Sequence, residues 1–519
     1  MIPNEHSQPR RVQTLRGRGG AVVPFNRLES QAWDLLAALA WGRHPHPLAR
    51  LRDVLQDLTG RRILLAPSGQ AAIAQILSSL PQREVVMAAY LCEQVKRAAE
   101  IAGKRVIYVD LARNSVNATS SEFAEAAKPG RILLAVHVWG VPTDIEAICQ
   151  LAKDRDCVVI EDAVPAFGGR WNGRLLGTFG DFGVFSFHYS KRLSALRGGA
   201  IVVNNDRIVD PVKLEASRVV QSRRAMPIRD LLVALAQNLA TTPWIYRNFT
   251  RPLLPLRGSV PLLWRKPRQK RAPVHADRQA AAPTTDHFTR DYAREIHPCQ
   301  AGLELGVPGR FGETRERIAH LAAFYDETFD QFIRDYTREV HPYQAELALR
   351  VLRRFDETRE RIARLATIYQ EAFRDTPITT FLPPGCDNAG LVRFPVAFPG
   401  KDRAEILRLA QKRGLYLKVL WGPLPDESEL ARFPNAVRVA RSLVLLPLYS
   451  TLPPESAERL AQNLIEIERN APEVEPAKRL ASGVPAARSQ HAEVSRQERN
   501  LQASAFSNQQ EHPSAVTEN

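Results

Sequence analysis

The sequence predicts an α/β protein, in which a large domain with a mostly parallel sheet between helices precedes a small C-terminal α+β domain. Short β-rich runs alternate with helical patterns from Arg61 to Asn205, as in chains built from βαβ units. A second, smaller set of strand and helix patterns runs from Thr376 to Asn470. The chain has 519 residues, 44% of them hydrophobic, which suffices for two or three domains with sizeable cores.

A helical pattern from Pro24 to Gly60 opens the large domain. The strands expected after it are RILLA, EVVMAAY, RVIYVDL, RILLAVHVWG, CVVIEDA, DFGVFSF and GAIVVNN. Helices are expected between them at 69–80, 93–102, 119–127 and 144–154. In the small domain, LVRFPVAF and SLVLLPLY are expected to be strands, and KDRAEILRLAQKRG and PPESAERLAQNLIEIER to be helices.

An internal repeat separates the two domains. The segment 288–329 recurs 44 residues later as 332–373, with about two thirds of the aligned positions identical. The first copy carries Gly and Pro where a helix should run, and interior Gly costs about 1 kcal/mol and Pro about 3 kcal/mol. We therefore expect the second copy to form the structural helix pair and the first to be an insertion.

Seven regions follow from these patterns. They are a flexible N-terminal arm (1–22), the large domain (23–205), a basic Pro/Arg-rich connecting segment (206–287), the duplicated helical insertion (288–331), a helical connection (332–375), the small domain (376–470) and a disordered tail (471–519).

Charge and cysteine content narrow the class of protein. Much of the net charge of +15 lies in the N-terminal arm and between Arg218 and Arg278, which is typical of a solvated basic loop. It would also suit a nucleotide diphosphate or weak contact with an anionic membrane surface, whereas specific nucleic-acid binding is not expected. The start has no apolar leader, and the weakly charged stretch Leu231–Tyr246 is too short to span a bilayer. The five scattered cysteines fit a reducing cytoplasm and indicate no metal site.

Two strand ends carry the residues with the most informative chemistry. One apolar run ends in Glu161-Asp162, and a second, GVFSFHYSK, ends in Lys191. Parallel strands bring such ends to one sheet edge, so a carboxylate and an amine should meet there. An acid that keeps a ring nitrogen protonated and a lysine that forms an imine are what pyridoxal phosphate chemistry requires. Glu161 competes with Asp162 on sequence alone, since strand alternation points them in opposite directions.

A phosphate site is expected beside this pair. Ser68-Gly69-Gln70 precede a helical run, so backbone N–H groups at that helix start could hold a phosphate. For Ser68, an ordinary N-cap role explains the residue equally well.

The motifs together resemble the DegT/DnrJ/EryC1/StrS family of sugar aminotransferases, which are fold-type I pyridoxal-phosphate enzymes. The resemblance covers about residues 25–205 and 332–468. The motifs that carry it are APSGQAAI, GKRVIYVDL, HVWGVPTDIEAI, VVIEDAVPAFGG, GDFGVFSFHYSK with the Gly198-Gly199 turn, and LVLLPLYSTLPPE.

The resemblance implies a pyridoxal 5'-phosphate cofactor in a PLP-transferase-like large domain and assigns its contacts. Lys191 matches the catalytic lysine that binds the cofactor covalently, and Asp162 the acid that faces the ring nitrogen. Ser186 matches a phosphate ligand, joined by Ser68, Gly69 and Gln70. Tyr90 is the aromatic residue nearest the ring-stacking position, and His188 would contact cofactor or substrate unless it is a structural histidine.

The chain departs from the family pattern at several positions. Pro165 stands where Gln or His is common, Cys92 near the stacking aromatic, and Thr337 near an Asn that reaches the partner's phosphate. Proline has no side-chain donor, so its contact with the cofactor's phenolic oxygen is lost or supplied elsewhere.

The resemblance therefore implies an aminotransferase that moves an amino group from an amino acid, with glutamate expected, to a keto-sugar nucleotide. Such chemistry serves cell-surface polysaccharide or secondary-metabolite sugar biosynthesis, and the protein would be a cytoplasmic homodimer. Two alternatives remain open: a sugar dehydratase-like enzyme, which Lys191 disfavours because such members carry histidine there, and a non-catalytic or regulatory protein, which Pro165 and Thr337 favour.

Overall fold

The structure is a computed structural model that describes residues 23–43, 45–208, 228–250, 340–383, 386–415 and 417–473. The chain divides into two compact units, Met1–Leu256 with Thr337–Asn519, and Arg257–Tyr336. All described residues belong to the first unit. The predicted N-terminal arm, the first repeat copy and nearly all of the predicted tail lie outside the described residues, as do Thr337 and most of the basic segment.

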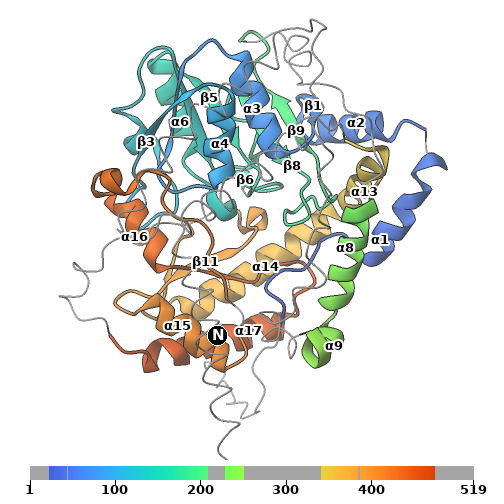
Figure 1. The fold of residues 1–519 in the computed structure, drawn as a ribbon, viewed down its shortest axis with the longest axis vertical. Helices are drawn as coiled ribbons and strands as arrows, with labels where there is room; N and C mark the ends of the chain where they lie inside the picture. The colour runs from blue at the N-terminus through green and yellow to red at the C-terminus, as the bar shows by residue number, and fades with distance from the viewer. Residues whose placement is uncertain are drawn as a thin grey trace, which may run out of the picture. The chain divides into compact units, whose positions relative to one another are not determined.

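A seven-stranded sheet forms the centre of the large domain (Figure 1). The strand order is β1-β9-β8-β5-β4-β2-β3, in which β8, β5, β4, β2 and β3 run parallel. β9 is antiparallel to both β1 and β8. The strands are β1 (Arg62–Ala66), β2 (Glu84–Ala88), β3 (Arg105–Val109), β4 (Arg131–Val136), β5 (Val158–Asp162), β8 (Phe182–Ser186) and β9 (Gly199–Val203).

Every residue of β5, β8 and β9 is buried, because helices cover the sheet. These helices are α2 (Pro47–Thr59), α3 (Gly69–Ser79), α4 (Glu93–Ile101), α5 (Ser120–Phe123) and α6 (Ile145–Asp154). α5 is shorter than the helix expected over 119–127, since Pro129 and Gly130, the latter at φ +76°, follow closely. Between β5 and β8, β6 (Arg170–Trp171) and β7 (Arg174–Leu175) form a hairpin.

The second repeat copy forms two helices, α13 (Pro342–Leu352) and α14 (Phe355–Phe373). α13 begins at a proline preceded by His341, whose ring accepts a hydrogen bond from the Tyr343 N–H at 3.1 Å. Its apolar face is buried at Leu347 and Val351, and that of α14 at Ile362, Leu365, Tyr369 and Phe373.

The small domain is built on the three-stranded antiparallel sheet β10 (Thr379–Thr380), β11 (Phe394–Ala397) and β12 (Leu443–Leu446). Its helices are α15 (Arg403–Lys412), α16 (Pro434–Ser442) and α17 (Pro454–Asn470), and α17 packs on both α14 and α15. The predicted fold class, α/β with a mostly parallel sheet flanked by helices, is confirmed.

Beside the large domain, the described residues also form α1 (Ala32–Ala37), η1 (Ala38–Arg43), α8 (Ile228–Ala240) and α9 (Pro243–Ile245), which runs on into η3 (Tyr246–Thr250). The remaining short 3₁₀ segments are η2 (Val138–Gly140), η5 (Asn388–Gly390) and η6 (Glu427–Arg432). In the part of the chain that the structure describes, no helix combines the length and apolar character needed to cross a membrane.

Candidate active site

Asp162 and Lys191 lie at one edge of the central sheet. Asp162 is the last residue of β5 and pairs in register with Val184 of the neighbouring parallel strand β8. β8 ends at Ser186, and a loop carries the chain on through Lys191 to the Gly198-Gly199 turn. The Phe187 N–H donates to the Gly198 carbonyl at 2.8 Å, and the Lys191 N–H to the His188 carbonyl at 2.9 Å, so this loop is held at both its base and its tip.

Burial shifts the pKa of both the Lys191 amine and the Asp162 carboxyl group. It lowers the pKa of the Lys191 amine, and Arg393 lowers it further, whereas Cys92 and the Asp162 carboxylate act in the opposite direction. Burial raises the pKa of Asp162, whereas the hydrogen bond from the Val164 N–H and the positive charge of Lys191 lower it. These mutual effects place the amine, the carboxylate and the Cys92 thiol within electrostatic reach of one another.

Asp162 keeps one oxygen for a ligand. Its Oδ1 accepts a hydrogen bond from the Val164 N–H at 2.9 Å, while Oδ2 has no hydrogen-bond partner among the described residues. Lys191 likewise makes no side-chain hydrogen bond or ion pair within this set. Both groups therefore have hydrogen-bonding capacity that the described residues do not use.

Glu161, the competing carboxylate, is sealed on the other side of β5. Its Oε1 accepts from the Gly177 N–H at 2.6 Å and Oε2 from the Phe179 N–H at 2.7 Å. Oε1 also lies 3.0 Å from Nε2 of His137, which is buried like Glu161. Because His137 Nδ1 accepts the Thr143 N–H at 3.1 Å, Nε2 carries the proton and donates to Glu161. Glu161 thus organises the β5–β8 connection and has no oxygen left for a ligand.

The start of α3 forms a tight cradle beside Ser186. Ser68 caps the helix, and its hydroxyl accepts the Ala71 N–H at 3.0 Å. A Cβ at Gly69 would lie 2.7 Å from Val164 Cγ2 and 3.0 Å from Ser186 Cβ, so only glycine fits there. The turn Gly198-Gly199 closes the cradle from behind, since a Cβ on Gly199 would meet the Ser68 carbonyl carbon at 2.7 Å. Backbone N–H groups at this helix start and the Ser186 hydroxyl converge on one small space.

His188 and Tyr90 have other partners. His188 Nδ1 lies 2.8 Å from the Ser190 hydroxyl, and burial, with Lys191 and Arg197, lowers the pKa of His188 to about 3, which leaves it neutral at physiological pH. The Tyr90 hydroxyl donates to the Leu420 carbonyl at 3.0 Å. Cys92, at the N-cap of α4, interacts electrostatically with Lys191. Burial raises the pKa of the Cys92 thiol, so this thiol is neutral. A cofactor contact of Tyr90 therefore stays a prediction.

Arg393, which lies just before β11, is a residue of this region that no sequence motif indicates. It is 7% exposed, and its Nε is buried without a hydrogen-bond partner. Nη2 donates to Asn26 at 2.8 Å, and no carboxylate neutralises the guanidinium within the described residues. Burial and the nearby Arg192 together lower the pKa of Arg393 to about 10, although Glu29 acts in the opposite direction. The nearby Glu29 is occupied by Arg192 at 2.6 Å.

An aromatic stack joins the large domain to the segment between α15 and α16. The rings of Trp139 and Trp421 stack with centroids 3.8 Å apart, and Tyr90 lies 6.2 Å from Trp421. Both tryptophans adopt positive φ, at 60° and 70°, which is unusual for so large a side chain. No motif in the sequence pairs these two distant positions.

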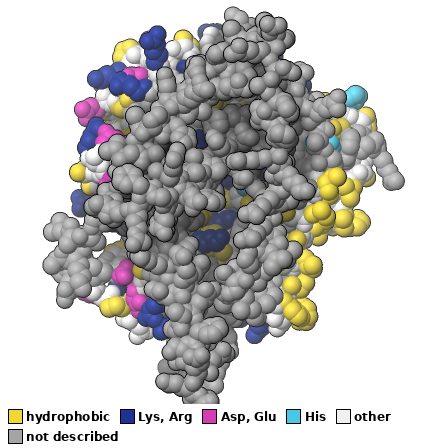
Figure 2. All heavy atoms as spheres, in the orientation of Figure 1, with side chains coloured by type: hydrophobic (Ala, Val, Ile, Leu, Met, Phe, Trp, Pro, Cys, Tyr) yellow, Lys and Arg dark blue, Asp and Glu magenta, His cyan; other side chains and the backbone are white. Residues whose placement is uncertain are grey.

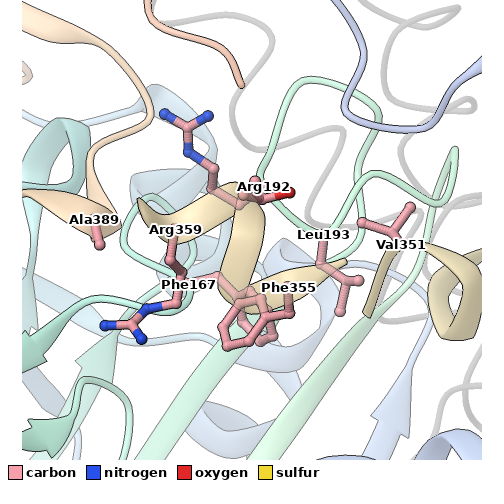
Figure 3. Close-up of a pocket in the computed structure, with 8 residues that line it drawn as sticks. Phe167, Arg192, Leu193, Val351, Phe355, Arg359 and Ala389 are labelled. Carbon is pink, nitrogen blue, oxygen red and sulfur yellow. The ribbon is translucent and has the colours of Figure 1, made fainter. Parts of the chain in front are cut away.

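A small apolar pocket adjoins the site without including Lys191 or Asp162 (Figure 3). The rings of Phe167 and Phe355 lie together at its floor, while the guanidinium groups of Arg192 and Arg359 point away from each other. Arg192 is held by Glu29 and by the carbonyls of Leu391 and Leu448. The residues that line this pocket therefore pack the loop that carries Lys191 against α14. Among the described residues, no cluster of His, Cys, Asp and Glu could hold a metal ion.

Comparison with known proteins defines the class. A family model described as the DegT/DnrJ/EryC1/StrS aminotransferase family matches residues 55–228 and 326–465. The chain belongs to this family, which confirms the resemblance found in its motifs. GDP-perosamine synthase of Escherichia coli O157:H7 is 34% identical over 114 residues, which are 22% of this chain and 31% of that protein.

Other relatives agree at the level of family and fold. The UDP-N-acetyl-3-dehydro-alpha-D-glucosamine 3-aminotransferase of Acidithiobacillus ferrooxidans is 33% identical over 143 residues, 27% of this chain and 39% of that protein. The chain thus matches about a third of the length of these two curated relatives. Helicobacter pylori PseC, an aminotransferase in pseudoaminic acid biosynthesis, shares the fold with a TM-score of 0.56 at 14% identity, over 86% of this chain and 99% of its own. E. coli GDP-4-keto-6-deoxy-D-mannose-3-dehydratase does so with a TM-score of 0.54 at 14% identity, over 86% and 99%.

Proposed function

We propose that this protein is a pyridoxal-phosphate-dependent aminotransferase that moves an amino group from an amino acid to a keto-sugar nucleotide. The observation that carries the proposal is the pairing, at one sheet edge, of the half-buried Lys191, whose pKa is lowered, with the buried Asp162, one oxygen of which has no hydrogen-bond partner among the described residues. Membership of an aminotransferase family and similarity to two sugar-nucleotide enzymes support it.

The residues present fit pyridoxal phosphate group by group. The cradle of Ser68, Gly69 and Gln70 with the Ser186 hydroxyl would hold the phosphate, at a helix start that favours negative charge. Asp162 Oδ2 would face the pyridine nitrogen, and Lys191 the aldehyde carbon. When bound, the cofactor supplies an electron sink for the bond next to the amine.

The protein's own side chains would supply the nucleophile and the proton transfers. The Asp162 carboxylate would hold a proton on the ring nitrogen, and such a contact would offset the burial that raises the pKa of Asp162. The lowered pKa of Lys191 keeps a fraction of Nζ unprotonated, so that it can attack as a nucleophile and then carry protons between substrate atoms. Neutral His188 adds no charge beside it.

Arg393 would bind an anionic part of a substrate. It is a buried cation without a carboxylate partner, and it acts electrostatically on Lys191. A carboxylate of the amino donor, with glutamate expected, or a phosphate of the nucleotide would neutralise it by charge-assisted hydrogen bonds.

The proposal extends to location and assembly. A cytoplasmic homodimer that serves cell-surface polysaccharide or secondary-metabolite sugar biosynthesis is the arrangement expected from the family, and light scattering of the purified chain tests its dimeric state. A weak contact of the basic segment with an anionic membrane surface is part of the same proposal.

Addition of pyridoxal phosphate to the purified full-length chain tests the function. A new absorption band that disappears on addition of glutamate and returns with a keto-sugar nucleotide would support transamination. If the band forms but glutamate and other amino donors leave it unchanged, the chain is a cofactor-binding protein without this activity. If no band forms, the proposed function is wrong.

A further inference from the structure

Arg192, the residue that follows Lys191, makes several side-chain contacts where Lys191 makes none. Its side chain is 6% exposed, and Nη1 donates to Oε1 of Glu29 at 2.6 Å. Nη2 donates to the Leu391 carbonyl and, at 3.4 Å, to the Leu448 carbonyl. Leu391 directly follows η5 and Leu448 follows β12, so both carbonyls belong to the small domain. Arg192 therefore joins the loop that carries Lys191 to the small domain.

Glu29 extends this connection to a further residue of the small domain. Its Oε2 accepts a hydrogen bond from the Ser450 hydroxyl at 2.6 Å, and Oε1 accepts one from the Ser450 N–H at 3.3 Å. The Glu29–Arg192 pair is buried, and loss of one partner would leave an uncompensated charge in the interior. Charge-assisted hydrogen bonds of this kind are short and directional. Glu29 therefore holds the Arg192 guanidinium in one position.

The chain segment that carries Glu29 is fixed by contacts of its own. The Ser30 hydroxyl lies 3.3 Å from the Ser194 hydroxyl of the lysine-bearing loop. The Ser30 carbonyl accepts a hydrogen bond from the Asn238 side chain of α8 at 3.3 Å. α8 packs against α1, at the edge of the molecule where Figure 2 shows hydrophobic side chains gathered. Glu29 is therefore held in place independently of Arg192.

The Lys191 amine depends on its backbone for its position. Among the described residues the Lys191 side chain makes no hydrogen bond or ion pair. Adjacent Cα atoms lie about 3.8 Å apart, so a shift of Arg192 moves the backbone of Lys191 directly. Leu193, the next residue, is 1% exposed and lines the apolar pocket of Figure 3. The residues that follow Lys191 therefore fix the point from which its amine projects.

We propose that Arg192 is a positioning residue which, together with Glu29, couples the position of the Lys191 amine to the small domain. The proposal rests on the proposed function, in which this amine attacks and carries protons. A misplacement of about 1 Å can cost about 10²-fold in rate. Arg192 acts through the backbone of Lys191, because Glu29 and the two carbonyls occupy both of its terminal nitrogens.

Arg359 of α14 provides a matched control. It lines the same pocket, its Nε donates to the Gly168 carbonyl at 2.7 Å, and its Nη2 donates to Asp387 at 2.9 Å. It thus also contacts both the large and the small domain, but it is distant from Lys191 in sequence. Its guanidinium points away from that of Arg192 (Figure 3). The same Arg→Lys exchange at the two positions therefore separates a general loss of domain contacts from an effect on Lys191.

Amide hydrogen exchange of the cofactor-free full-length chain, read by mass spectrometry, tests the coupling. In Arg192→Lys, exchange over residues 187–198 should rise by about tenfold or more, since lysine keeps the charge but cannot reach Glu29 and both carbonyls together. Ser450→Ala removes only the hydroxyl contact with Glu29 and should raise exchange over the same residues by a smaller factor. Arg359→Lys should exchange there like the wild type.

A pH titration of the absorption band of the pyridoxal-phosphate-loaded protein tests the effect on the amine. Arg192→Lys should shift the midpoint of the spectral change by about half a pH unit or more, because the amine sits differently among its charged neighbours. In amino transfer, kcat should fall by about tenfold while KM changes by less than about threefold. Arg359→Lys should match the wild type in the midpoint and in kcat.

Three results would overturn the proposal. They are wild-type exchange and a wild-type spectral midpoint in Arg192→Lys, equal changes in Arg192→Lys and Arg359→Lys, and wild-type exchange over 187–198 in Ser450→Ala. If Arg192→Lys does not fold, as circular dichroism would show, the comparison of Ser450→Ala with Arg359→Lys decides by the same criteria. Absence of the band in the wild type would count against the proposed function instead, and exchange in the cofactor-free chain would still decide the coupling.

Discussion

The two sides of β5 carry adjacent carboxylates in opposite situations. Glu161 lies in a closed network, where three backbone N–H groups and His137 occupy both of its oxygens. Asp162, the next residue, accepts one hydrogen bond from the Val164 N–H at Oδ1, while Oδ2 has no hydrogen-bond partner among the described residues, and the carboxylate acts electrostatically on Lys191. Both are buried, at 0% and 3% exposed. Burial therefore does not distinguish a structural carboxylate from a functional one, whereas hydrogen-bond saturation does.

Lys191→Ala should produce the largest change on the open side. Loss of the amine removes both the covalent link to the cofactor and the proton carrier, so turnover should fall by about 10³-fold or more. Steady-state amino transfer measures this, with Lys153→Ala on the exposed face of α6 as the control. Retention of more than a tenth of wild-type turnover would rule out the assigned role.

Replacement of Glu161 and of Asp162 by the corresponding amide should have different effects on stability and on amino transfer. Glu161→Gln puts an NH₂ group against backbone N–H donors, so the free energy of unfolding should fall by about 3 kcal/mol. Asp162→Asn should change the stability of the cofactor-free chain by less than about 1 kcal/mol, since burial already disfavours its ionised form, while lowering amino transfer. Urea unfolding measures the free energy of unfolding of both variants. Equal losses of stability would contradict the distinction between a structural Glu161 and a functional Asp162.

The lowered pKa of Lys191 predicts a pH effect on stability. Between this pKa and the unfolded value of about 10.4, the unfolded chain binds more protons, so stability rises with pH. As the pH rises toward 10.4, the stability of the cofactor-free wild type should increase relative to that of Lys191→Met, by up to about 1.4 kcal/mol per pH unit. Parallel stability profiles for the two proteins would show that the amine is not held in a desolvated site; Lys153→Met is the exposed control.

Gly69→Ala should have the smallest effect of the four. Its methyl group would press on Val164 and Ser186 and narrow the phosphate cradle, so affinity for pyridoxal phosphate should drop by about tenfold. Gly60→Ala is the control: at the C-cap of α2, with φ +63° and open space around it, it strains the backbone but does not touch the cradle, so it should bind the cofactor like the wild type. Absorbance titration gives both affinities, and unchanged binding in Gly69→Ala would place the phosphate elsewhere.

Much of this comparison could be predicted from the sequence. All seven strands of the central sheet lie within the runs identified by their apolar pattern, and those runs place Asp162 and Lys191 at one edge. Alternation put Glu161 and Asp162 on opposite faces, but the closed network around Glu161 depends on Gly177 and Phe179, which approach it only through the fold. Trp421 and Arg393 were missed because they reach the large domain from distant segments.

Reduction of the pyridoxal-phosphate-loaded protein with borohydride, followed by peptide mass spectrometry, tests the central claim most directly. We expect a phosphopyridoxyl group on Lys191 in the wild type and in folded Glu161→Gln protein, and no such group at this position in Lys191→Ala. Labelling of another lysine at equal yield, or an unlabelled Lys191 in loaded protein, would contradict the assignment of this sheet edge as the cofactor site.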